Sequence, residues 1–258
     1  MHEADVPLEP PQSGLAGLLG RPTWREAGWA LELADLFRSP VWRGDGVPPG
    51  EGRPVLIVGG FGAGTGSSAI LERWLRRAGY VVVDAAVGRN VGPSERSVSA
   101  IRQAVTELRA ATGRRPVVIG HSRGGHQARV AAVRDPDQLA LLVTLGSPHR
   151  QAYPPHLYVR LPIEGLRLAA RFGVLGPGAR FDEEDFHRDR EAAFPPELPF
   201  VTMWSKTDGV VDWRACLDPA AEDVELRATL LGLAAGAPAY RALAAVLGRR
   251  DVRQRSEP

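Results

Sequence analysis

The sequence predicts an α/β fold in which a mostly parallel sheet is covered by helices on both sides. Short β-branched runs alternate with stretches of helical periodicity along most of the chain. The strand-like runs are apolar on both faces, as expected for strands buried between two layers of helices. With 258 residues, 44% of them hydrophobic, the chain is long enough to bury the core of one such domain.

A first helix is expected from Trp24 to Phe37, where apolar residues recur at helical spacing, and Ser39-Pro40 ends it. β-branched and apolar runs predict strands over 55–58, 80–84, 117–119, 140–145, 200–204 and 224–226. Helical periodicity or small apolar residues predict helices over 69–78, 98–111, 124–133 and 239–247.

The two ends and one internal stretch depart from this alternation. Residues 1–22 are rich in Pro and Gly, and residues 249–258 form a charged tail, so we expect loose ends around a domain of residues 23–248. Residues 150–199 bring Tyr, Pro, a short apolar helix over 163–172 and an acidic cluster at 182–185. An insertion above the carboxyl ends of strands predicts a cap over a pocket, and a surface excursion without a ligand is the alternative.

Composition excludes several classes of protein. Thirty-two basic and thirty acidic residues leave a net charge of +2, which argues against a nucleic-acid partner. Cys216 is the single cysteine, so internal disulfides and multi-cysteine metal sites are excluded. The sequence shows no apolar run of membrane-spanning length and no secretion signal, which predicts a cytoplasmic protein without a membrane span. We expect no metal and no other cofactor.

One short motif carries chemistry. Residues 120–124, Gly-His-Ser-Arg-Gly, fit Gly-x-Ser-x-Gly, directly after an apolar strand and directly before a small-residue helix. Such a turn strains the serine backbone, and β-carbons at the flanking glycines would clash. The motif predicts Ser122 as a nucleophile at a helix N-terminus, where developing negative charge is favoured. A glycine-rich turn without catalysis is the alternative.

A serine nucleophile needs donors for the oxyanion of its intermediate. The backbone N–H after the nucleophile, that of Arg123, is the first expected donor. The second should come from the loop after the first strand, Gly59 to Gly62, where we assign it to the N–H of Phe61, or failing that Gly62.

The next glycine run gives a rival interpretation. Residues 64–69, Gly-Thr-Gly-Ser-Ser-Ala, fit a dinucleotide-binding fingerprint, and Asp84 lies twenty residues after Gly64. However, these glycines begin six residues beyond Val58 instead of in the tight turn itself. Short-chain dehydrogenases need a Tyr-x-x-x-Lys pair. Lys206 is the only lysine, and Thr202 stands where that pair would need tyrosine. Nucleotide binding is therefore the weaker interpretation.

Taken together, the motifs resemble those of α/β-hydrolases of the esterase and lipase kind, in particular an actinobacterial-type group with a Gly-x-Ser-Arg-Gly-Gly turn. The similarity covers about Trp24 to Leu247. The matching motifs are Trp24 to Ala27, Ser39 to Val41, Gly59 to Phe61, Gly88 to Gly92, Gly120 to Gly125, Thr144 to Pro148 and Ser205 to Cys216. In that family the catalytic order is serine, acid, histidine. The resemblance implies Asp208 as the acid, with Asp212 in reserve.

The third catalytic residue departs from the family pattern. The resemblance implies a histidine just before Gly232-Leu233-Ala234, but Leu230 occupies that position and no histidine follows His187. His149 follows the strand expected beside that of Ser122, so it is the candidate substitute base, although it can equally be a wall of the pocket. His121 is expected to point away from Ser122.

Three classes of function follow. The first is a serine hydrolase that acts through Ser122 on a small carboxylic ester or related acyl compound, with His149 or a cap histidine as base. The second is a catalytically silent hydrolase fold that binds a small apolar ligand or a partner. The third is a non-hydrolytic enzyme, such as an eliminase, cyclase or acyl transferase, that uses the same pocket.

Overall fold

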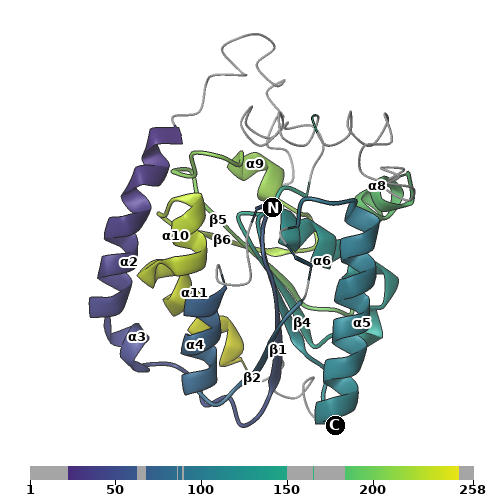
Figure 1. Ribbon diagram of the computed structural model, residues 1–258, viewed down its shortest axis with the longest axis horizontal. Coiled ribbons are helices and arrows are strands. Elements are labelled where there is room, and N and C mark those ends of the chain that lie inside the picture. Colours follow the sequence, from purple (N-terminus) through teal and green to yellow (C-terminus); the bar gives the residue numbers. More distant parts are fainter. Residues whose placement is uncertain are drawn as a thin grey trace, which may run out of the picture.

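A computed structural model describes residues 23–62, 68–85, 87–88, 90–149, 165 and 184–249. The expected α/β fold class is confirmed: six parallel strands form one sheet in the order β2-β1-β3-β4-β5-β6, with helices on both faces (Figure 1). The strands are β1 (Pro54–Val58), β2 (Val81–Asp84), β3 (Val117–His121), β4 (Leu141–Leu145), β5 (Phe200–Trp204) and β6 (Glu222–Glu225).

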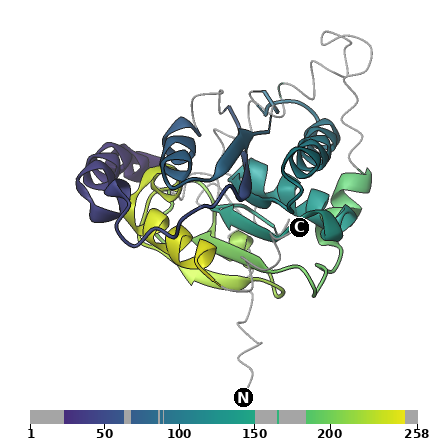
Figure 2. The same cartoon turned by 90° about the horizontal axis from the view of Figure 1, so that it is seen from below.

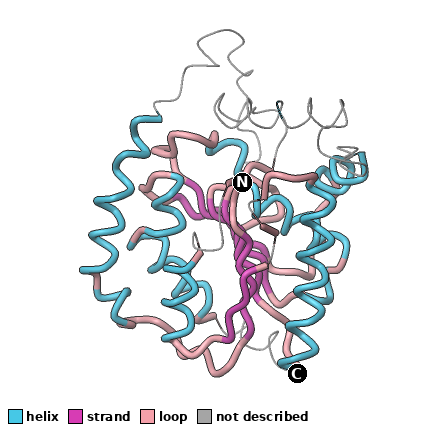
Figure 3. Tube along the Cα trace, in the orientation of Figure 1, coloured by secondary structure: helices cyan, strands magenta, loops and turns pink. Residues whose placement is uncertain are grey.

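Two helical layers enclose the sheet, as Figure 2 shows from below and Figure 3 shows by type of element. One layer holds α2 (Trp29–Arg38), α3 (Pro40–Arg43), α4 (Ala69–Arg77), α10 (Leu230–Ala235) and α11 (Ala237–Leu247). The other holds α5 (Ser94–Thr112), α6 (Arg123–Arg134) and α8 (Glu184–Glu191). The remaining short elements are η1 (Thr23–Gly28), η2 (Pro136–Gln138) and α9 (Trp213–Cys216).

The apolar strands are explained by burial on both faces. In β1, Val55 and Ile57 pack into the cluster under α4 and α11, whereas Leu56 and Val58 pack into the cluster under α5 and α6. Successive side chains of a strand point to opposite faces, so every residue of β1 is buried. Central parallel strands therefore show continuous apolar runs instead of alternation, which is the pattern that predicted this fold.

The expected strands agree with the structure to within two residues at each end, and the expected long helices to within four. The first expected helix is divided, because η1 is a 3-10 segment that leads into α2. Pattern alone did not predict α8, α9 or α10, each of which has eight residues or fewer. The expected loose ends, apart from residue 249, and the helix expected at 163–172, apart from residue 165, lie outside the described residues. None of the helices in the described ranges is long and apolar enough to cross a membrane.

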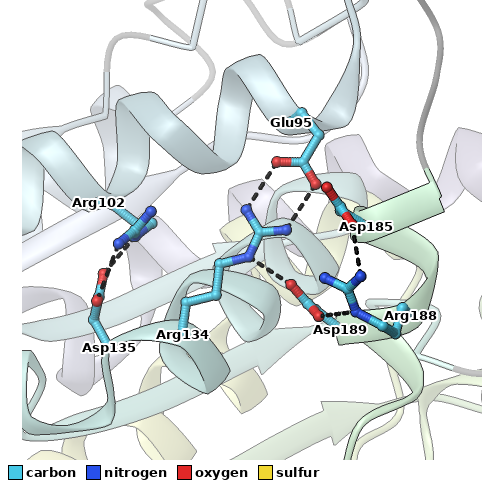
Figure 4. Close-up of polar contacts among 7 residues, drawn as sticks. All are labelled: Glu95, Arg102, Arg134, Asp135, Asp185, Arg188 and Asp189. Atoms are coloured by element: carbon cyan, nitrogen blue, oxygen red, sulfur yellow. Dashed lines mark hydrogen bonds and ion pairs between the residues drawn. The ribbon is translucent and has the colours of Figure 1, made fainter.

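Helix α8 belongs to the expected insertion, and salt bridges attach it to α6. The Arg134 guanidinium lies 2.7 Å from Asp189 of α8 and donates to both carboxylate oxygens of Glu95 of α5, at 2.7 and 2.8 Å (Figure 4). Deeper in, Arg129 and Asp218 form a buried pair at 2.7 Å, and Arg129 also donates to the carbonyl of Arg190. These contacts fix the end of the insertion against the layer that carries α6.

The strand order creates a switch point at the carboxyl edge of the sheet. From β1 the chain moves outward to β2 and then crosses back to β3 on the other side of β1. The loop after β1 and the turn after β3 therefore leave the sheet side by side. In open α/β sheets, ligands bind in the crevice at such a point.

Candidate active site

Ser122 occupies the turn between β3 and α6 and has a backbone that L-residues rarely adopt. Its φ is 51° and its ψ is −124°, a conformation that costs of order 1–3 kcal/mol for a residue with a side chain. Two hydrogen bonds hold the turn: Ser122 N–H donates to the Leu145 carbonyl at 2.8 Å, and Gly125 N–H donates to the Ser122 carbonyl at 3.0 Å. The hydroxyl makes no hydrogen bond within the described part of the chain.

Glycines around this turn let the backbones of β1, β3 and α6 approach one another closely. A β-carbon on Gly120 would stand 2.4 Å from the Gly125 Cα, and one on Gly124 would stand 2.4 Å from the Val58 carbonyl oxygen. A β-carbon on Gly60 would stand 3.1 Å from Ser122 Cβ. The first turn of α6 is therefore pressed against the end of β1, and any side chain at positions 120 or 124 would force them apart.

The two expected oxyanion donors are the N–H groups of Arg123, which follows Ser122, and of Phe61, which follows Gly60. Arg123 is the first residue of α6, so its N–H is among the four N-terminal groups that have no acceptor within a helix. Phe61 lies in the loop after β1, and its ring centroid is 6.0 Å from the Arg123 guanidinium. The guanidinium itself donates to the Gly92 carbonyl at 2.6 Å, which directs the charged group towards the start of α5.

Asn90 connects the same loop to the helices behind it. Its amide donates to the Gly59 carbonyl at 2.9 Å and to Gln127 Oε1 of α6 at 2.8 Å, and its oxygen accepts from Ser97 of α5 at 3.2 Å. Asn90 is 1% exposed and has a φ of 49°. The sequence did not indicate this role, although Asn90 lies in one of the motifs that carry the resemblance.

Asp208 lies in the loop after β5 and is buried. Its Oδ1 accepts the N–H groups of Val210 and Val211 at 2.7 and 2.8 Å, so the loop itself stabilises the carboxylate. Its Oδ2 borders Gly146, where a β-carbon would stand 3.4 Å from Oδ2 and 2.6 Å from Leu230 Cδ1. Asp208 and Leu230 thus meet at one point beside β4.

Asp212, the reserve acid, has a different local role. Its Oδ1 accepts the Arg214 N–H at 2.9 Å, which makes Asp212 the N-cap of α9.

Two glutamates from the N-terminal segment, not singled out in the sequence analysis, join the loops of Asp208 and Leu230. Glu26 Oε1 accepts the N–H groups of Gly209 and Leu230, each at 3.0 Å, and Oε2 accepts that of Leu231 at 3.2 Å. Glu32 binds the N–H and the hydroxyl of Thr229, the N-cap of α10, at 2.9 and 2.6 Å. These contacts span about 200 residues of sequence, so no local pattern could have indicated them.

His149 is buried among groups other than Ser122. Its Nε2 lies 3.1 Å from the Thr144 hydroxyl, its ring stands edge-on to Phe200, and its Nδ1 is buried without a hydrogen bond in the described structure. Burial lowers the pKa of His149 to about 3, so the ring is neutral at pH 7. The assignment of His149 as substitute base stays a prediction.

His121 contacts the start of α10 through its ring. Its Nε2 lies 3.0 Å from the Leu230 carbonyl oxygen, and a β-carbon on Gly60 would stand 3.3 Å from its Nδ1. The expectation that His121 points away from Ser122 stays a prediction. Alternation ends where Ser122 adopts its positive φ, and both side chains border the space at Gly60.

The low pKa of His149 predicts an acid-labile component of stability. Below pH 6.5 the unfolded chain protonates this ring, whereas the folded chain does so only near pH 3, so the free energy of unfolding falls as the pH drops through this range. In urea unfolding, the wild type should lose about 2 kcal/mol more of its free energy of unfolding than His149→Gln does between pH 7 and pH 5. A difference that stays constant would contradict a neutral, buried ring.

No protein-family model matches the chain, but solved structures do. Metagenome-derived lipolytic enzymes, LipS and LipT, are represented by a structure with 17% identity and a TM-score of 0.56, covering 81% of this chain and 96% of that one. The mature lipase BlEst2 of Bacillus licheniformis matches with 14% identity and a TM-score of 0.56, over 78% and 94% of the two chains. A monoacylglycerol lipase of Paleococcus ferrophilus matches with 15% identity and a TM-score of 0.53, over 78% and 96%. At these identities the likeness shows the fold, and the chain has the α/β-hydrolase fold.

Proposed function

We propose that this protein is a serine hydrolase that acts on a carboxylic ester or a related acyl compound, with Ser122 as the nucleophile. The observation that carries the proposal is the strained backbone of Ser122 at the switch point of the sheet. Strain of this size persists only where the surrounding structure enforces it, and it is concentrated at functional sites. The likeness to lipases and lipolytic enzymes is consistent with this chemistry.

The chemistry assigned to each residue follows from its place in the turn. Ser122 Oγ attacks the acyl carbon, and the carbonyl oxygen becomes an oxyanion held by the N–H groups of Arg123 and Phe61. The N-terminus of α6 stabilises this charge further through its backbone dipoles. The leaving group departs with a proton, and water then hydrolyses the acyl-enzyme.

We further propose that Leu230 stands where a triad histidine would stand, and that Asp208 is the former triad acid. Both border Gly146, and Leu230 is the first residue of α10. The triad of this chain is therefore degenerate. Because its own loop donates two N–H groups to Asp208, the buried carboxylate is retained without a histidine.

A silent fold that binds an apolar ligand is the second candidate, and the presence of Leu230 favours it. Leu230 packs with Trp204, Val210 and Val211 in a small apolar cluster at the carboxyl edge of the sheet. In this candidate function Ser122 has no reactivity above that of an ordinary serine. Turnover of simple esters separates the two functions.

Ser122→Ala should reduce hydrolysis of p-nitrophenyl acetate and butyrate to background, a loss of at least about 100-fold, because no other group forms the acyl-enzyme. Ser147→Ala is the matched control, since it also removes one hydroxyl beside α6 and should keep the wild-type rate. Wild-type turnover in folded Ser122→Ala would remove Ser122 from the mechanism.

Leu230→His should raise ester hydrolysis by about 100-fold or more, because an imidazole at this position would lie beside Asp208 Oδ2 and could serve as general base. The gain should disappear when Ser122→Ala or Asp208→Asn is added to the variant. A gain that survives Ser122→Ala would come from imidazole acting alone. No gain in a well-folded variant would mean that Leu230 does not stand at the triad position or that another residue already serves as base.

A further inference from the structure

A serine nucleophile needs a base, and His121 has its tautomer fixed by its partner. A carbonyl oxygen only accepts hydrogen bonds, so His121 Nε2, 3.0 Å from the Leu230 carbonyl, must carry the hydrogen. In the neutral ring, Nδ1 then carries the lone pair. Nδ1 makes no hydrogen bond to the residues that the structure describes, and the His121 side chain is only partly buried.

This lone pair borders the space in front of Ser122. A β-carbon built on Gly60 would stand 3.3 Å from His121 Nδ1 and 3.1 Å from Ser122 Cβ, so both atoms border the same small space. Glycine at position 60 leaves this space open, whereas a side chain would occupy it. A proton can pass between a serine hydroxyl and an imidazole directly or through one water molecule.

A carboxylate lies behind the histidine, as it does in a complete triad, but it acts through the backbone. Glu26 binds the N–H groups of Leu230 and Leu231 and so fixes the first turn of α10. The carbonyl of Leu230 in this turn holds the His121 ring. Burial lowers the pKa of His121, and the hydrogen bond to the Leu230 carbonyl and then the negative charge of Glu26 partly oppose this effect.

We propose that His121 is the general base of this site, held by the Leu230 carbonyl and Glu26 in place of the absent triad histidine and its acid. The inference rests on the proposed function, because only a nucleophilic Ser122 needs a base. As Oγ bonds to the acyl carbon, its proton passes to Nδ1 and the carbonyl electron pair moves to oxygen. The imidazolium then returns the proton to the leaving alkoxide as the carbon–oxygen bond breaks. A water molecule repeats the sequence to release the acid.

His149 is the competing base, and its surroundings favour it less. Its Nε2 lies against the Thr144 hydroxyl, its Nδ1 is fully buried, and its ring packs on Phe200. A ring whose pKa lies near 3 is also a weak proton acceptor at neutral pH. His121 instead borders the same space as Ser122.

His121→Gln is the most informative variant. The glutamine amide can still donate to the Leu230 carbonyl, so a purely structural role would survive, but it cannot accept the proton. We expect kcat for p-nitrophenyl butyrate to fall by about 100-fold or more with little change in KM. The acid limb of the wild-type pH profile, with its midpoint below 6.5, should disappear, and added imidazole should restore part of the rate to His121→Ala.

Glu26→Gln should remove the negative charge and keep one oxygen that accepts the N–H groups of Gly209 and Leu230, whereas its amide nitrogen cannot accept the N–H of Leu231. Because the negative charge of Glu26 raises the pKa of His121, removal of this charge should move the acid limb of the pH–rate profile to lower pH. His126→Gln is the control for the loss of an imidazole: His126 lies on α6, packs against Phe186 and should keep both the rate and the pH profile.

The outcomes separate this inference from the function on which it rests. Loss of turnover in Ser122→Ala together with an unchanged rate and acid limb in His121→Gln would overturn the role of His121 and leave the hydrolase. Loss of the acid limb in His149→Gln but not in His121→Gln would do the same and assign the base to His149. Wild-type turnover in Ser122→Ala would overturn both.

Discussion

The close approach of α6 to the ends of β1 and β3 is the constraint on which the candidate site depends. Gly120 and Gly124 have no space for a β-carbon, because the backbones of Gly125 and Val58 lie where it would be. This packing sets the positive φ of Ser122 and places Arg123 at the head of a helix beside the loop of Phe61. Packing around the switch point maintains the strain at Ser122. The same packing positions the Ser122 hydroxyl relative to the backbone of Arg123 and Phe61.

Hydrogen bonds to the backbone hold the loop of Asp208 and the start of α10 in place. Asp208 accepts two N–H groups of its own loop, and Glu26 holds that loop against the start of α10. A buried carboxylate that is hydrogen-bonded in this way costs far less than one left unpaired. These hydrogen bonds therefore hold the two loops together, and the ring of His121 lies 3.0 Å from the Leu230 carbonyl oxygen at the start of α10.

The fold was predictable from local patterns because its central strands are buried on both faces and its helices have clear periodicity. The turn at Ser122 was predictable for a related reason, since the glycine spacing of this strand–turn–helix motif is itself local in the sequence, even though Gly124 is required by the distant backbone of Val58. The roles of Glu26, Glu32 and Asn90 were not predictable, because all their partners except Ser97 lie between about 30 and 200 residues away. The contact of His121 with the Leu230 carbonyl was not predictable either, because the two residues lie 109 positions apart.

The central claim is that the geometry of this turn makes Ser122 a nucleophile in spite of the incomplete triad. The most direct measurement is the reaction of the native protein with a fluorophosphonate probe, followed by peptide mapping of the adduct, with urea-unfolded protein as the reference. The account predicts one adduct, on Ser122, that forms in the native protein and not in the unfolded chain. No adduct in the native protein, or an adduct on another residue, would contradict it.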